Sequence, residues 1–165
     1  MILHGQKSKL KLALPSDAPL ILQWENNPEF WPITEQPGPF ELHQIEEALQ
    51  QSGSLERHQQ ARWIVFDLGM RPVGLLDLFN FDATQKKAGI GILIGSASDR
   101  QKGFAADAIR TLLLRLRAIQ QVHILECMIH EDNFQSIRLF QHLGFIEISR
   151  CTFKNKPAIN LTLNV

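Results

Sequence analysis

Residues 98–106 read Ser-Asp-Arg-Gln-Lys-Gly-Phe-Ala-Ala, and a long apolar segment follows them directly. We predict a helix over residues 103–120, because its apolar residues share one stripe: Phe104, Ala108, Leu112, Leu116 and Ile119. The first turn of a helix presents backbone N–H groups that have no partner within the helix, together with about half a positive charge. The stretch at 98–106 therefore decides what the front of this helix can hold.

The residues around this helix start favour an anion. Gly103 lets a ligand approach the backbone, and Ala105 and Ala106 add little bulk. Arg100 and Lys102 place positive charge beside the free N–H groups. We interpret the stretch as a site for a phosphate or diphosphate group, although neither the P-loop spacing nor the dinucleotide-binding glycine motif is present. The alternative is that Gly103 only eases a turn into a buried helix.

The length of 165 residues predicts a single domain over residues 1–165. Seventeen basic and seventeen acidic residues cancel, so the net charge argues against nucleic acid or a membrane surface as a partner. Cys127 and Cys151 lie in apolar, strand-like runs, which indicates reduced core cysteines and a cytoplasmic protein. No Cys and His spacing suggests a metal site, and no segment resembles a signal peptide or a membrane span.

The rest of the chain alternates between strands and helices. Apolar and β-branched runs predict strands at residues 9–14, 62–68, 73–81, 88–95, 122–129, 145–153 and 157–163. Helical spacing predicts further helices at residues 18–26, 42–49 and 133–143. The glycines inside residues 88–95 indicate a bulge or a close backbone approach. This order predicts a mixed sheet with helices on both faces.

Several motifs in a fixed order point to a known family. Arg100-x-x-Gly103-x-Ala105 follows a glycine-containing strand and opens a long helix, and a later helix begins at Asn133-x-x-Ser136 and runs into Leu-Gly-Phe at residues 143–145. This arrangement resembles the GNAT superfamily of acyl-CoA-dependent N-acetyltransferases, over roughly residues 8–164. The resemblance implies an α/β GNAT fold: a mixed, mostly antiparallel sheet of six to seven strands, with a splay between the fourth and fifth strands and helices on both faces.

The resemblance also implies how acetyl-CoA binds. Its pyrophosphate would accept hydrogen bonds from the N–H groups of residues 101–106, and its pantetheine arm would pair with the backbone of residues 92–94. Asn133 would cap its helix and contact the cofactor, with a plain helix cap as the alternative. The implied cofactor-binding residues are Ile92, Leu93, Ile94, Arg100, Gln101, Lys102, Gly103, Phe104, Ala105, Ala106, Asn133, Ser136 and Phe140.

Acetyl transfer to an amine must stabilise an oxyanion and protonate the departing thiolate. In the family a backbone N–H of the splayed strand, here Leu93 or Ile94, usually does the first, and a tyrosine often does the second. This chain has no tyrosine, and Phe140 stands at the matching position. Water or the substrate's own proton could replace the phenol, another donor such as His130 or His142 could do so, or the chain could bind acyl-CoA without efficient turnover. We favour the first explanation.

Two carboxylates among apolar strand residues are candidates for the base that deprotonates the amine. Asp77 shares a strand face with Leu75 and Phe79, and Glu126 lies within residues 122–129. Burial would raise the pKa of either carboxyl group and suit it to proton transfer. The alternative for each is a structural or solvent-facing acid that pairs with Lys or Arg.

The segment from Trp24 to Trp31 resembles a subgroup that includes spermidine acetyltransferases and ribosomal-protein alanine N-acetyltransferases. The acceptor implied is a small polyamine-like amine, with a protein N-terminus or a non-catalytic acyl-CoA-binding role as alternatives, and a homo-oligomer is compatible with the resemblance. Many relatives have Glu where this chain has Gly89. The candidate acceptor-binding residues are Glu25, Glu29, Trp31, Glu35 and Glu41, and the alternative for each acid is a solvated side chain.

Overall fold

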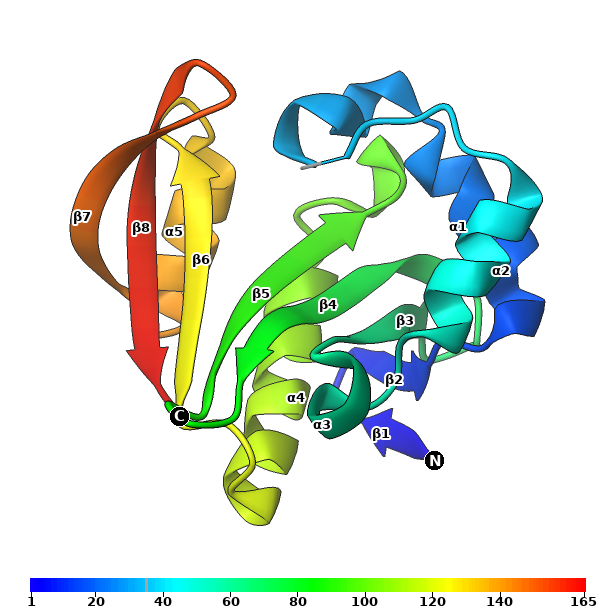
Figure 1. Ribbon diagram of the computed structural model, residues 1–165, viewed down its shortest axis with the longest axis horizontal. Helices are drawn as coiled ribbons and strands as arrows, with labels where there is room; N and C mark the ends of the chain where they lie inside the picture. Colours follow the sequence, from blue (N-terminus) through cyan, green and yellow to red (C-terminus); the bar gives the residue numbers. More distant parts are fainter. Residues whose placement is uncertain (35) are drawn as a thin grey trace.

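The chain folds around one eight-stranded sheet with the order β1-β2-β3-β4-β5-β6-β8-β7 (Figure 1). The structure is a computed structural model and describes residues 1–34 and 36–165. Its strands are β1 (Ile2–His4), β2 (Ser8–Leu12), β3 (Ala61–Asp67), β4 (Pro72–Asp82), β5 (Lys87–Ile94), β6 (Ile124–His130), β7 (Ile146–Phe153) and β8 (Lys156–Asn164). Its α-helices are α1 (Ala18–Glu25), α2 (Leu42–Gln50), α3 (Leu55–His58), α4 (Phe104–Ile119) and α5 (Phe134–His142). Three 3₁₀ turns are η1 (Pro15–Asp17), η2 (Pro28–Ile33) and η3 (Ala97–Asp99).

The mixed, mostly antiparallel sheet confirms the predicted fold class. Every neighbouring pair of strands is antiparallel except β5 and β6, which are parallel. Two short elements were not predicted. Strand β1 has three residues, and helix α3 has four, so neither is long enough to show a periodic pattern. The expected six to seven strands become eight because of β1.

Apolar side chains on alternate strand positions build a separate core on each face of the sheet. Leu76, Leu78 and Ile90 pack in one cluster with the apolar stripe of α4 and with Phe140 of α5. Ile64 and Leu75 lie in a second cluster with Ile21 of α1 and Ile45 of α2. The alternation is the ordinary consequence of a two-residue strand period. Both faces are therefore covered, and in Figure 1 α4 crosses the sheet on the side opposite α1 and α2.

The cysteines differ in their surroundings. Cys127 is buried in the core, and Cys151 on β7 is half-buried, so only the first fits the expectation of a core residue. Both are free thiols. Across residues 1–34 and 36–165, no helix is long and apolar enough to cross a membrane.

The first turn of α4 is tied to the turn between β1 and β2 by Asp107. Its buried carboxylate accepts hydrogen bonds from the backbone N–H groups of Gln6 (3.1 Å), Lys7 (2.9 Å) and Ser8 (2.8 Å), and from the Ser8 hydroxyl (2.7 Å). Burial alone would raise the pKa of Asp107, but these hydrogen bonds outweigh it and hold the pKa below its ordinary value. The chain start is thereby fixed against the front of α4.

We expect Asp107→Asn to lower the free energy of unfolding by about 2 kcal/mol at pH 7, because charge-assisted hydrogen bonds are lost at a buried site. A carboxyl group whose pKa is depressed by folding stabilises above its unfolded value, near 3.9, and this contribution disappears as the pH falls through the folded-state pKa. Urea unfolding between about pH 5 and pH 3 should therefore show a steeper loss of stability in the wild type than in Asp107→Asn. Asp132→Asn, at an exposed position, is the control. Equal slopes would contradict the assignment.

Candidate active site

A cleft opens where β5 and β6 part. The two strands pair over only three positions, from Lys87–Ile124 to Gly89–Glu126. In Figure 1 they lie together near the C-terminus and then diverge. The cleft between them is lined by residues of β5, β6, η2, α5 with its N-cap, and the end of β7: Ile33, Ile90, Gly91, Ile92, Cys127, Met128, Ile129, His130, Asn133, Ser136, Phe140 and Phe153. The splay predicted between the strands at 88–95 and 122–129 is therefore confirmed.

The hydrogen-bond pattern of β5 determines which backbone groups face this cleft. Gly95 N–H donates to the Val73 carbonyl of β4 at 2.9 Å, and the Lys86 carbonyl accepts from Ile124 N–H at 3.2 Å. Successive residues of a strand direct their N–H and C=O groups to opposite sides. Odd-numbered residues of β5 therefore face β4, and even-numbered residues face β6.

Ile90, Ile92 and Ile94 consequently direct their N–H and C=O groups toward the side of β6. Because Gly89 faces β4, its pairing with Glu126 takes up the Ile90 N–H. The Ile90 carbonyl and both groups of Ile92 and Ile94 lie beyond this last pair, so β6 does not satisfy them. Leu93 lies opposite Leu75, and the alternation points its N–H toward β4. Of the two donors expected from the sequence, Leu93 and Ile94, the register favours Ile94. The available donors are the even-numbered neighbours of Leu93.

The front of α4 offers a second set of free donors. The first backbone bond of the helix runs from Asp107 N–H to the Gly103 carbonyl at 3.0 Å. Within the described residues, the N–H groups of residues 101–106 have no hydrogen-bond partner. Gly103 has φ 89° and Gln101 has φ 62°, so the chain turns twice through the left-handed region before the helix begins. The turn exposes successive N–H groups, which is the arrangement of an anion site.

Basic side chains surround these donors, although each also has a partner on the protein. Arg100 lies 2.8 Å from the carboxylate of Glu29 and 5.7 Å from the ring centre of Phe30, both in η2. Lys102 lies 3.6 Å from Asp99. Lys7, which the sequence did not single out, donates to the Lys102 carbonyl at 3.3 Å and lies beside Gly103. It therefore adds a third cation from the turn between β1 and β2.

A buried carboxylate, Asp99, fixes the turn before α4. Asp99 accepts a bidentate pair of hydrogen bonds from Arg71, at 2.8 and 2.9 Å. These bonds and the nearby positive charges outweigh burial and lower the pKa of Asp99. The carboxylates of Asp99 and Asp107 thus bond to groups other than the free N–H groups of residues 101–106.

The wall opposite β5 comes partly from α5. Asn133 accepts from Ser136 N–H at 3.3 Å and so caps the helix, and both residues also line the cleft. Phe140 lines the same cleft and packs edge-on against Phe145, with ring centres 5.0 Å apart. The three residues predicted from this helix therefore gather at one wall.

The Asp77 carboxylate forms an ion pair with an arginine on the neighbouring strand β3. Arg62 of β3 donates two hydrogen bonds to it, at 2.7 and 2.9 Å, and a third to Glu25 of α1 at 2.6 Å. Burial by itself would lower the pKa of Arg62, but the charges and hydrogen bonds of Asp77 and Glu25 prevail and raise it. The register places Asp77 opposite Gly91, so this cluster lies one strand away from the cleft. It carries two negative charges and one positive charge.

Glu126 lies at the closed end of the splay. It is the last residue of β6 to pair with β5, and its carboxylate lies 3.5 Å from the Lys87 ammonium. Its side chain is 40% exposed. Both candidate bases therefore form ion pairs, as the alternative reading of each supposed.

The other candidate acceptor residues are dispersed. Trp31 donates its indole N–H to the Glu25 carbonyl at 2.9 Å and so lies next to the Arg62 cluster. Glu29 is taken by Arg100. Glu41 is the exposed N-cap of α2. Glu35 lies outside the described residues. Glu25 and Trp31 are thus the two that the described fold brings together.

The packing around β5 explains why position 89 is a glycine. A Cβ atom built at this position would lie 2.3 Å from the ring of Phe79, and the same ring lies 3.6 Å from a Cβ built at Gly91. The phenyl ring therefore covers β5 at this position. The glycines of this strand predicted a bulge or a close backbone approach, and at Gly89 the close neighbour is a side chain, the Phe79 ring.

Two more cleft residues escaped sequence reasoning or were left among alternatives. Cys127 lines the cleft from β6, and burial raises the pKa of its thiol to about 12, so it stays protonated. His130 ends β6 and is buried in the cleft wall. His142, by contrast, is an exposed residue at the end of α5. A histidine at the end of an apolar strand was the available signal.

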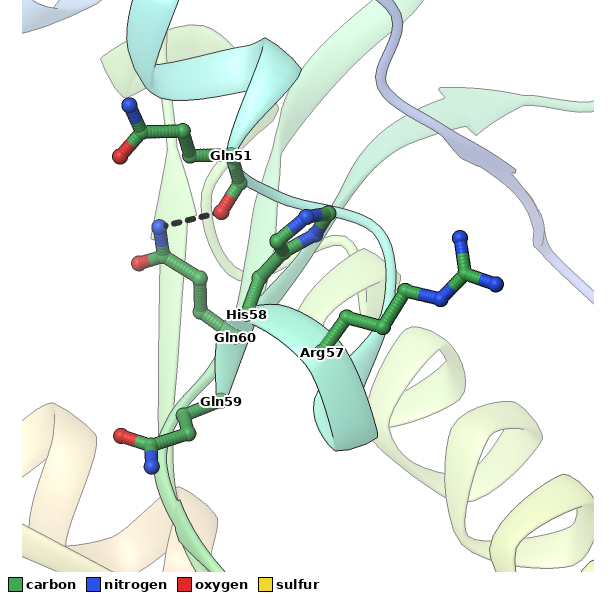
Figure 2. Close-up of a pocket in the computed structure, with 5 residues that line it drawn as sticks. All are labelled: Gln51, Arg57, His58, Gln59 and Gln60. Atoms are coloured by element: carbon green, nitrogen blue, oxygen red, sulfur yellow. Dashed lines mark hydrogen bonds between the residues drawn. The ribbon is translucent and has the colours of Figure 1, made fainter.

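A second hollow lies between α2 and α3. Figure 2 shows its lining residues, Gln51, Arg57, His58, Gln59 and Gln60, with the Gln60 amide donating to the Gln51 carbonyl at 2.9 Å. It contains neither a carboxylate nor an unpaired strand edge. The chemistry therefore belongs to the cleft between β5 and β6.

The family model of the acetyltransferase (GNAT) domain matches residues 9–146. The chain belongs to the GNAT acetyltransferase family. Its fold, its splayed strands and its helix start at residue 103 agree with this membership, and the acetyl donor of such an enzyme is acetyl-CoA. No curated protein matches the chain in a sequence search.

Several solved structures share the GNAT fold over nearly the whole chain. A ribosomal-protein alpha-N-acetyltransferase in complex with coenzyme A has a TM-score of 0.83 at 15% identity, covering 100% of this chain and 98% of that one. A spermidine N-acetyltransferase from Vibrio cholerae, with coenzyme A and spermine, has a TM-score of 0.81 at 19% identity and covers 95% of each chain. A dodecameric structure of spermidine N-acetyltransferase from the same organism has a TM-score of 0.77 at 19% identity, covering 95% and 93%. These likenesses show that the chain has the fold of these enzymes.

The GNAT domain should tolerate a larger residue at 89 only if the ring above it is removed. We expect Gly89→Ala to lower the free energy of unfolding by about 1–3 kcal/mol, because the new methyl group meets Phe79. The double variant Gly89→Ala with Phe79→Ala should lose less stability than the sum of the losses in the two single variants, by about 1 kcal/mol or more. Urea unfolding of the four proteins measures this coupling. Strictly additive losses would show that the ring does not occupy this space.

Proposed function

We propose that this GNAT domain transfers the acetyl group of acetyl-CoA to a primary amine by direct attack in the cleft between β5 and β6. The observation that carries the proposal is that the structure has two sets of free backbone groups: the even-numbered groups of β5 beyond its pairing with β6, and the N–H groups of residues 101–106. The first suits an amide-containing chain, and the second suits a diphosphate. Both groups belong to the same donor molecule, coenzyme A.

The diphosphate would lie at the front of α4. The free N–H groups of residues 101–106 would bind its oxygens, and Lys7, Arg100 and Lys102 would offset its charge. Gly103, at φ 89°, keeps this surface free of a side chain. Arg100 would then bind the diphosphate in place of Glu29 or together with it, so ligand binding would also affect the position of η2.

The pantetheine arm would add to the edge of β5 as a short strand. The Ile90 carbonyl and the N–H and C=O groups of Ile92 and Ile94 would be its partners, and the N–H of Ile92 or Ile94 would stabilise the oxyanion when the amine attacks. Of the two residues expected in this role, Leu93 and Ile94, the proposal keeps Ile94. Asn133, Ser136 and Phe140 would close the other side of the arm.

The acceptor would enter from the face that carries Trp31 and the cluster of Glu25, Arg62 and Asp77. Two carboxylates and one guanidinium leave this cluster with a net charge of −1, which favours a cationic amine. A small polyamine-like amine is our first candidate, supported by the spermine that the Vibrio cholerae enzyme holds. A protein N-terminus is the second, because the paired acids suit one positive charge better than several.

Replacing Gly103 by Asp should weaken coenzyme A binding at least about tenfold, since a charge at about 4 Å costs between 1 and 4 kcal/mol. Gly103→Asn is the matched control: Asn has the same size, carries no charge and also tolerates a left-handed backbone. Isothermal titration calorimetry of the three proteins measures the difference. If the Asp and Asn variants bind coenzyme A equally well, the diphosphate does not lie at this helix start.

Thiol release from acetyl-CoA with a panel of amines tests the reaction and the acceptor. We expect release with spermidine or spermine, and mass spectrometry should show the acetylated amine. Release only with peptides that have a free N-terminus would favour the second candidate. Tight coenzyme A binding without release for any amine would contradict an enzymatic role and leave an acyl-CoA-binding domain.

A further inference from the structure

The reaction needs a group that takes a proton from the attacking amine, and most ionisable side chains around the cleft are already engaged. Asp77 is held by two hydrogen bonds from Arg62. Glu126 pairs with Lys87 at the closed end of the splay. Cys127 is a buried neutral thiol. His130 is the remaining titratable residue that lines the cleft among the described residues.

One hydrogen bond fixes the tautomer of His130. Its Nε2 atom lies 3.0 Å from the Phe153 carbonyl oxygen, and the two rings pack with centres 5.2 Å apart. A carbonyl oxygen can only accept, so Nε2 carries the proton of the neutral ring. The lone pair then lies on Nδ1, which is the atom able to bind a further proton.

The Nδ1 atom is the free nitrogen of the ring. It has no hydrogen-bond partner among residues 1–34 and 36–165. Within the same residues, no side-chain nitrogen or oxygen is both buried and without a partner. Nδ1 must therefore be reached by solvent, although the residue as a whole is only 6% exposed. The opening that His130 lines is the cleft itself.

The two acids that follow His130 in the chain pair with basic side chains of β7 and β8. Glu131 pairs with Arg150 at 3.0 Å, and Asp132 lies 3.8 Å from Lys156. Lys154 donates to the Trp31 carbonyl at 2.7 Å. Among the described residues His130 itself forms no ion pair, so proton uptake by the ring does not break one.

We propose that His130 is the proton shuttle of the reaction, a role that rests on the acetyl transfer proposed above. The amine nitrogen forms the new C–N bond with the acetyl carbon, and its proton goes to Nδ1 of His130. The C–S bond breaks, and its electron pair stays on the sulfur of coenzyme A. The imidazolium then gives the proton to this thiolate, directly or through the Ser136 hydroxyl, so the products are an amide and a free thiol. His130 ends neutral, and no phenol is required at position 140.

The test compares His130→Gln with wild type. The Gln amide can still donate to the Phe153 carbonyl but cannot take up a proton, so folding and coenzyme A affinity should persist. We expect kcat to fall about 100-fold or more. The acidic limb of the wild-type pH–rate profile should be lost, and added imidazole should raise the rate of His130→Ala. His142→Gln, on the exposed end of α5, is the matched control and should keep the wild-type rate.

The outcomes separate this proposal from the proposed function. Wild-type thiol release with an undiminished rate and an unchanged pH profile in His130→Gln overturns the shuttle and leaves the acetyltransferase intact. Coenzyme A binding without wild-type release for any amine overturns both. A slow His130→Gln enzyme whose acidic limb persists assigns that limb to another group and also contradicts the shuttle.

Discussion

The early end of pairing between β5 and β6 is the constraint on which the site depends. Backbone N–H and C=O groups inside a protein need partners, and an interior strand normally obtains them from both neighbours. Beyond the Gly89–Glu126 pair, which takes up the Ile90 N–H, β5 has a partner only in β4. The Ile90 carbonyl and the backbone groups of Ile92 and Ile94 are left facing a cleft whose far wall is β6 and α5. A bound chain with alternating amides would complete the sheet, which is why we propose that the pantetheine arm binds here.

The second free donor set is preserved because the protein satisfies its own charges elsewhere. Asp107 is saturated by the turn between β1 and β2, and Asp99 by Arg71. Both carboxylates fix the loops that flank the start of α4, and neither occupies the N–H groups of residues 101–106. The site is therefore organised before a ligand arrives, which lowers the conformational cost of binding. The same anchoring brings Lys7 to the site from the other end of the chain.

The sequence was sufficient for the parts of the fold that repeat or that form one contiguous motif. The α4 stripe, the Arg100-x-x-Gly103-x-Ala105 turn and the Asn133 cap are local patterns, and the structure places each where its pattern indicated. Features set by contacts between distant segments were missed or left open. Lys7 lies 95 positions from its partner Lys102, and the direction of the Leu93 N–H depends on the register with β4. Asp77 is an apolar-strand acid in sequence, but Arg62 and Glu25 determine its surroundings.

The most direct test is amide hydrogen exchange at single residues, measured by NMR with and without coenzyme A. The cleft account predicts slower exchange on binding at the amides of Ile92, Ile94 and residues 101–106, with little change at Leu93, whose N–H already faces β4. Tight binding with unchanged exchange at all of these amides, or with new protection confined to another face of the sheet, would contradict it.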